Sequence, residues 1–134
     1  MDAPTARRRL AGARVGRLAT VTAQGRPHIV PCCFVLHGDL IYSAVDAKPK
    51  STQDLRRLDN IHAHPQVALL VDHYDEDWDE LWWVRVDGTA QVWGPGPRRD
   101  VALAALAAKY HQYRVATPPG PVIEVEITGW RTWP

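Results

Sequence analysis

The segment Leu81-Trp82-Trp83-Val84-Arg85-Val86-Asp87-Gly88-Thr89-Ala90-Gln91-Val92-Trp93 predicts the longest strand of this chain. Successive side chains of a strand point to opposite faces, and one face here collects apolar residues: Trp82, Val84, Val86, Ala90 and Val92. The other face places Trp83 and Trp93 among polar residues: Arg85, Asp87, Thr89 and Gln91. A monomer would expose both tryptophans, so the pattern predicts a subunit interface.

Shorter segments with strand patterning lie on both sides of this strand. They cover residues 15–22, 27–36, 40–45, 66–73 and 121–128, and turn residues separate the first three. Helical spacing predicts a leading helix over residues 4–13 and inserted helices over 51–64 and 98–114. Six strands with short turns predict one mainly β domain over residues 1–134. We expect a closed or nearly closed antiparallel barrel, because closure removes exposed sheet edges.

The composition is that of an ordinary globular domain with 134 residues and a net charge of +1. This charge gives no global field that would attract nucleic acid or an anionic membrane. No apolar run approaches the ~20 residues of a membrane span, and the first residues lack the apolar core of a signal peptide. Cys32 and Cys33 are neighbours, and a bond between them would be strained, so we expect reduced thiols. These features predict a cytoplasmic protein.

The turn Lys48-Pro49-Lys50-Ser51 lies between a predicted strand and a predicted helix. Ser51 can cap that helix. Free backbone N–H groups at a helix start, beside two lysines, make a phosphate-binding site plausible. The alternative interpretation is a solvated basic turn, and Asp54 would compete with an anion for the same amides.

Candidate protein-borne catalytic and metal sites are scarce. Asp75, Asp77 and Asp79 imitate the start of a calcium loop, but later positions of that motif do not match, so we reject it. We predict no metal site, because no cysteine pair accompanies the histidines. Cys33 has no evident base partner, and we interpret it as a packed strand thiol. With no catalytic residue assigned, the sequence favours chemistry carried by a bound cofactor and equally permits a non-catalytic binding protein.

Several motifs together resemble the pyridoxamine-phosphate-oxidase-like flavin split-barrel superfamily, whose fold is the FMN-binding split barrel. The resemblance rests on these segments: Gly16-Arg17-Leu18-Ala19-Thr20-Val21, Gly25-Arg26-Pro27-His28-Ile29-Val30-Pro31, Lys48-Pro49-Lys50-Ser51, Leu55-Arg56-Arg57-Leu58, Pro65 and 67–71. Within the superfamily, the run from Leu70 to Trp78 and the following Leu81-Trp82-Trp83-Val84-Arg85 resemble the F420-dependent branch of actinobacteria.

The resemblance implies a six-stranded split barrel, a homodimer and cofactor sites between the subunits. It implies that Lys50, with Lys48 and Ser51, contacts the cofactor phosphate. It places the edge formed by Val30, Pro31, Cys32 and Cys33 along the deazaflavin ring. It also implies that Ser43, Ala44 and Val45 flank the ring and the ribityl chain, and that Trp78 comes from the other subunit.

We therefore expect a reductase that transfers a hydride from reduced coenzyme F420 to an unsaturated small-molecule acceptor. The alternatives are an FMN-dependent oxidase or reductase and a non-catalytic protein that binds F420 or a flavin. Nucleic-acid binding through the arginines of the leading helix is a poor fourth hypothesis at this net charge.

Overall fold

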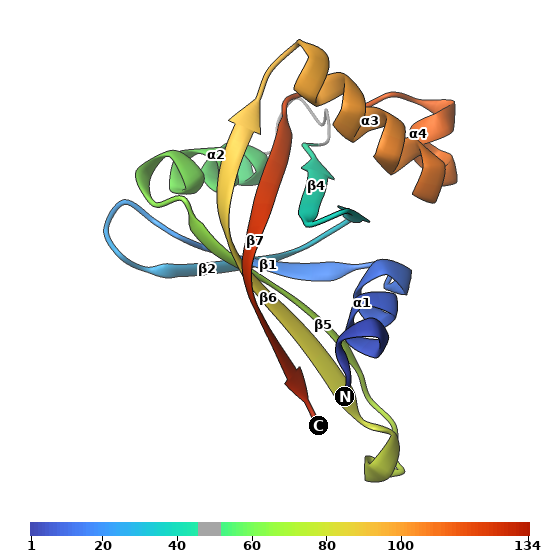
Figure 1. Cartoon of the computed structure of the whole chain (residues 1–134). Coiled ribbons are helices and arrows are strands. Elements are labelled where there is room, and N and C mark those ends of the chain that lie inside the picture. Colours follow the sequence, from blue (N-terminus) through green and yellow to red (C-terminus); the bar gives the residue numbers. More distant parts are fainter. Residues whose placement is uncertain (46–51) are drawn as a thin grey trace.

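The computed structural model describes residues 1–45 and 52–134. One antiparallel sheet curls into a half-barrel flanked by helices (Figure 1). Its strands are β1 (Gly16–Val21), β2 (Pro27–Cys32), β3 (Val35–His37), β4 (Leu40–Ala44), β5 (Gln66–His73), β6 (Trp82–Trp93) and β7 (Val122–Trp133), in the order β2-β1-β5-β6-β7-β4-β3. The helices are α1 (Ala3–Gly12), α2 (Thr52–Ala63), the short 3-10 helix η1 (Trp78–Glu80), α3 (Pro97–Lys109) and α4 (His111–Val115). The predicted mainly β antiparallel fold is confirmed, but the described residues form seven strands rather than six.

The seventh strand arises because Cys33 and Phe34 interrupt the strand predicted over residues 27–36. β2 pairs with β1, whereas β3 pairs with β4 at the opposite edge of the sheet. The chain crosses between these edges at Phe34, whose backbone N–H donates a hydrogen bond to the Tyr110 hydroxyl at 3.1 Å. A single strand was the wrong prediction, because a two-residue period does not reveal a change of pairing partner.

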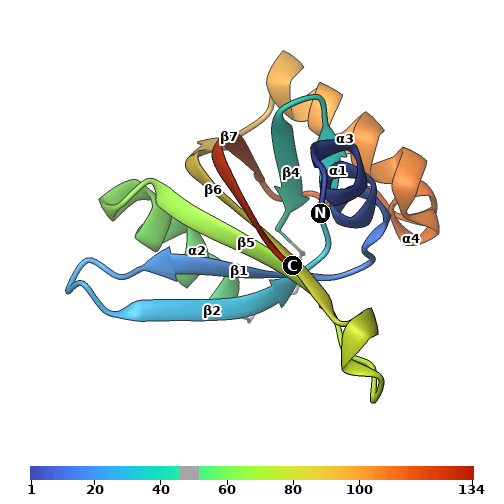
Figure 2. The ribbon, with the colours of Figure 1, turned by 60° about the horizontal axis from the view of Figure 1, so that its bottom comes forward.

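β7 continues to Trp133, past the predicted end at residue 128, and pairs with β6 along its length. A register shift between Asp87 and Gly88 lies opposite Gly129, so a bulge is found where the predicted strand ends. The two ends of the chain lie close together (Figure 2), and the amino group of Met1 donates to the Pro134 carbonyl at 3.1 Å.

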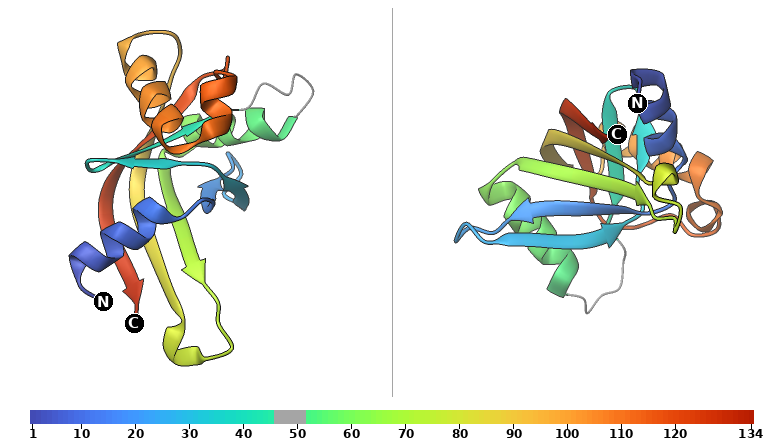
Figure 3. Two further views of the ribbon diagram at one scale, coloured as in Figure 1. Left: turned by 90° about the vertical axis from the view of Figure 1, so that its right-hand side faces the viewer. Right: turned by 90° about the horizontal axis from the view of Figure 1, so that it is seen from below.

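Two apolar clusters cover opposite faces of β7, which is why residues 122–125 are all buried. Ile123 and Val125 pack inside the barrel, where Leu10 of α1 is also fully buried. Val122 packs outside with Leu106 of α3. Figure 3 shows α3 and α4 together near one end of the long strands and α1 beside their other half.

The exposure predicted for Trp93 in a single chain was wrong. Its side chain is half-buried and packs against the α3 cluster. The Arg98 guanidinium lies 4.3 Å from the centre of the indole ring and 3.6 Å from the Glu124 carboxylate. Trp83 is also half-buried. The exposure of these two rings therefore gives no support for a subunit interface.

The helix predicted over residues 98–114 is two helices with an extended residue, Tyr110, between them (φ −114°, ψ 119°). The break lets Lys109 and Tyr110 turn toward the link between β2 and β3. None of the described helices is both long and apolar enough to span a membrane.

Candidate functional site

A cavity of about 250 Å³ lies where β2 and β4 end, beside α2 and α4. Four residues predicted to contact a cofactor line it: Pro31, Cys32, Cys33 and Ala44. The other lining residues are Val15, Arg57 and Tyr113. The fold thus brings together side chains from five separate segments of the chain at the predicted ring-binding edge.

The backbone between β2 and β3, which borders this cavity, is fixed by three polar side chains. Ser43 Oγ donates to the Cys33 carbonyl at 2.8 Å. Lys109 Nζ donates to the Phe34 carbonyl at 2.8 Å and to the Ala13 carbonyl at 2.6 Å. The Tyr110 hydroxyl lies 3.0 Å from the Phe34 carbonyl oxygen. Such anchoring holds a binding surface in one geometry.

The two cysteines occupy different environments. Cys32 is buried, and burial raises the pKa of its thiol to about 11, although the Arg57 charge and a hydrogen bond with Ser43 act in the opposite direction. Cys33 is exposed, so the expectation of a packed thiol was wrong for this residue. The cavity therefore has one neutral buried thiol and one thiol open to solvent in its wall.

Arg57 is a functional candidate that the sequence prediction missed. It lines the cavity, yet the residue is only 8% exposed, which makes it a cation held at a fixed place. Positions i, i+3 and i+4 share one face of a helix, and Asn60 and Ile61 are buried with it. That spacing from apolar Ile61 could have indicated that Arg57 points inward.

The remaining predicted site residues have other positions. Ser43 and Val45 are buried; the backbone N–H of Val45 donates to the Pro121 carbonyl at 3.2 Å. Val30 lies half-buried in β2 and does not line the cavity. Trp78 is 69% exposed at the tip of the β5–β6 hairpin, which projects from the body of the protein (Figure 1). The three predicted phosphate-binding residues, Lys48, Lys50 and Ser51, lie outside the described residues.

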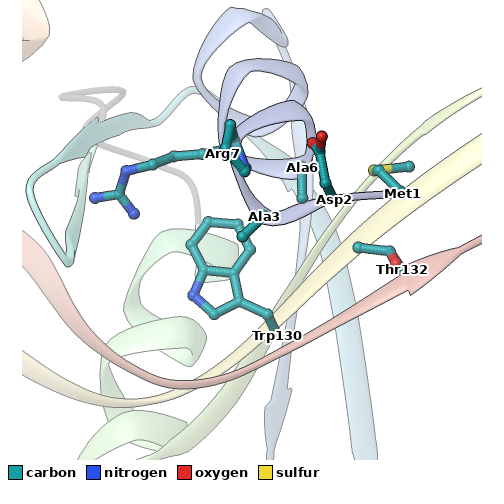
Figure 4. Close-up of a pocket in the computed structure, with 8 residues that line it drawn as sticks. Met1, Asp2, Ala3, Ala6, Arg7, Trp130 and Thr132 are labelled. Carbon is teal, nitrogen blue, oxygen red and sulfur yellow. The ribbon is translucent and has the colours of Figure 1, made fainter.

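A larger, mostly apolar cavity of about 590 Å³ lies between α1 and β7. The indole ring of Trp130 extends beneath the start of α1, next to Ala3 (Figure 4), and the Arg7 guanidinium lies 5.8 Å from the centre of that ring. Arg7 is held by the Gly38 carbonyl and the Asp39 carboxylate. None of the predicted site residues lines this cavity. Within the described part of the chain, no group of three or more His, Cys, Asp or Glu side chains could hold a metal ion.

Solved structures share this fold. A conserved hypothetical protein from Mycobacterium tuberculosis superimposes with a TM-score of 0.79 at 18% identity, over 99% of this chain and 84% of that chain. An FAD-binding protein from Mesorhizobium loti superimposes with a TM-score of 0.73 at 21% identity, over 98% of this chain and 94% of that chain. The heme storage protein HutZ from Vibrio cholerae superimposes with a TM-score of 0.75 at 15% identity, over 96% of this chain and 92% of that chain. Identities this low show a common fold alone, and no curated protein sequence matches the chain.

Residues 3–134 match the family model described as pyridoxamine 5'-phosphate oxidase. The match contains all seven described strands and every residue that lines the cavity at the end of β2. The superfamily that the sequence motifs resemble is thereby confirmed. The chain belongs to the pyridoxamine 5'-phosphate oxidase family.

Proposed function

We propose that this protein is an F420-dependent oxidoreductase that reduces an unsaturated small molecule. The observation that supports this most is the cavity lined by Pro31, Cys32 and Cys33 beside the buried cation Arg57. It lies at the edge that the sequence resemblance assigns to the deazaflavin ring. When bound, reduced F420 supplies the hydride, and the protein contributes binding, orientation and exclusion of water.

The described residues fit this role. The backbone at Cys33 and Phe34 is anchored by Ser43 and Lys109, so it forms a rigid wall for a flat ring. Arg57 supplies a permanent positive charge, which suits an anionic part of the cofactor. We assign the cofactor phosphate to Lys50, with Lys48 and Ser51. The segment that contains them runs from β4, whose Ala44 lines the cavity, to α2, which carries Arg57.

The size of the cavity supports a site completed by a second copy of the chain. Sites for small molecules commonly have volumes of about 300–1,000 Å³, whereas the described cavity has about 250 Å³. One chain therefore encloses only part of a cofactor. We propose a homodimer in which Trp78 from the partner contacts the cofactor, a role compatible with its exposure at a projecting hairpin tip.

Two alternatives have specific support. The similarity to an FAD-binding protein favours an FMN-dependent enzyme with the same cavity. The similarity to a heme storage protein favours a protein that binds its cofactor without turnover. Binding of FMN in preference to F420 would identify the first alternative. F420 binding without reduction of any of a broad panel of acceptors would identify the second.

The experiment compares F420 affinity in three proteins: the natural sequence, Lys50→Ala and Arg131→Ala. Loss of Lys50 should weaken binding by roughly 1.5–3 kcal/mol, the range of a charge-assisted contact. Arg131 is an exposed cation on β7 and serves as the matched control. Equal affinity in the natural protein and Lys50→Ala would reject the phosphate assignment.

A further inference from the structure

A third, polar cavity of about 670 Å³ lies between the β1–β2 hairpin and α2. Figure 2 shows α2 next to this hairpin. The hairpin contributes Thr22, Arg26 and His28, and the helix contributes Arg56, Asp59 and Asn60. None of these residues lines the cavity at the end of β2.

Both walls of this polar cavity are held in place by hydrogen bonds. In the hairpin turn, Thr22 Oγ1 accepts from the Arg26 backbone N–H at 3.0 Å, and the Thr22 N–H donates to the Arg26 carbonyl at 2.9 Å. Gly25 has a φ of 80°, a conformation that favours glycine. On the other wall, buried Asn60 donates from Nδ2 to Thr20 Oγ1 at 3.0 Å and fastens α2 to β1.

Two arginine side chains and one histidine nitrogen of the cavity have no partner among the described residues. Within residues 1–45 and 52–134, the guanidinium groups of Arg26 and Arg56 make no ion pair or hydrogen bond. His28 Nδ1 is buried and likewise has no hydrogen-bond partner among the described residues. Buried polar atoms without partners are uncommon in proteins, and each needs an explanation such as a missing ligand. Asp59 supplies one negative charge against the two arginines.

We propose that this cavity binds the phosphate group of a small molecule. Arginine presents planar donors that match phosphate oxygens, and here two arginines and a histidine come from a turn, a helix and a strand. Donors from three separate elements suit a tetrahedral anion with several free oxygens better than a planar carboxylate. The inference goes beyond the proposed function. His28 lies four residues, or about 13 Å of strand, from Cys32 in the wall of the proposed cofactor cavity. The phosphate site therefore does not depend on which cofactor that cavity binds.

The test follows backbone amide shifts of the full-length ¹⁵N-labelled protein during titration with inorganic phosphate at constant ionic strength. We expect saturable shifts at residues 22–28 and 56–60. Arg26→Gln and Arg56→Gln should each weaken phosphate binding at least tenfold. Both arginines are exposed, so these variants should keep the fold. Arg8→Gln removes another exposed arginine, on α1, and should bind like the natural protein.

The proposal would be overturned by shifts that rise linearly without saturation, by equal weakening in Arg8→Gln, or by tighter binding of malonate than of phosphate. Lys50→Ala separates this site from the proposed cofactor phosphate site. We expect that variant to keep the phosphate-induced shifts in full while losing F420 affinity. Loss of those shifts in Lys50→Ala would also contradict a separate site.

Discussion

The hydroxyl oxygen of Tyr110 lies 3.1 Å from the backbone nitrogen of Phe34 and 3.0 Å from its carbonyl oxygen, although the two residues are 76 positions apart. Phe34 is the point at which the chain crosses from one edge of the sheet to the other, and it leaves the β-ladder there. The Tyr110 hydroxyl, together with Lys109, which also donates to the Phe34 carbonyl, therefore replaces the ladder bonds that the crossing removes. The same contact fixes the wall of the proposed cofactor cavity.

Tyr110→Phe should lower the free energy of unfolding by about 1–3 kcal/mol, because the buried backbone of Phe34 loses a partner while the ring is kept. Urea denaturation measures this change. Tyr74→Phe is the matched control: among the described residues its hydroxyl bonds only Glu76, at an exposed site, so the expected change is within about 0.5 kcal/mol. Equal stabilities of the two variants would contradict the role given to Tyr110.

Gly88→Ala should destabilise the fold by about 1–3 kcal/mol through overpacking at the β6–β7 bulge. A Cβ atom at Gly88 would lie 2.5 Å from both the Glu126 carbonyl oxygen and Val125 Cγ1. Gly94→Ala is the control, because a Cβ there meets no atom within 4 Å. Thermal unfolding measures the Tm of both variants. An unchanged Tm for Gly88→Ala would contradict the predicted overpacking between β6 and β7.

Alternating patterns in the sequence predicted most of the sheet, because one buried face imposes a period of two on β6. They could not predict the break at Phe34, which depends on which strands pair. They also could not predict that Glu124 would be buried, since that requires α3 to bring Arg98 to within 3.6 Å of its carboxylate. Both features depend on contacts between segments that are distant in the sequence.

In the native protein, iodoacetamide should modify Cys33 much faster than Cys32. Cys33 is exposed, whereas Cys32 is 8% exposed and burial keeps its thiol in the protonated, unreactive form. Peptide mass spectrometry after timed alkylation measures the two rates. The control is the same reaction in urea, where the rates should converge, and similar rates in the folded protein would contradict the assigned burial.

Cys32 should also make the free energy of unfolding depend on pH in the alkaline range. Burial raises the pKa of this thiol from 9.0 to about 11, so between these values the unfolded chain binds fewer protons than the folded one. The free energy of unfolding then falls as pH rises from 9 to 11. Lys109 has the opposite effect: burial, together with the Arg14 charge, lowers its pKa from 10.5 to about 8. Its contribution to the free energy of unfolding therefore rises with pH between these values.

Comparison with Cys32→Ala measures the contribution of the thiol, because Lys109 is present in both proteins and Cys32 is the smallest of the influences on its pKa. Urea denaturation under reducing conditions should show the natural protein losing stability relative to Cys32→Ala as pH rises above 9. A difference between the two proteins that stays constant up to pH 11 would show that the folded and unfolded thiols titrate alike.

The candidate site could be predicted only in part. The resemblance indicated the edge at Pro31, Cys32 and Cys33, and these residues line one cavity. Arg57 was missed because arginine is usually solvent-exposed. The sequence did not indicate that the Ser43 hydroxyl donates a hydrogen bond to the Cys33 carbonyl.

The most direct test of the account is titration of the purified protein with coenzyme F420, followed by the fluorescence of the deazaflavin, with FMN titrated in parallel. The account predicts a saturable change in F420 fluorescence and binding at least tenfold tighter than that of FMN. No fluorescence change, or a preference for FMN, would contradict it.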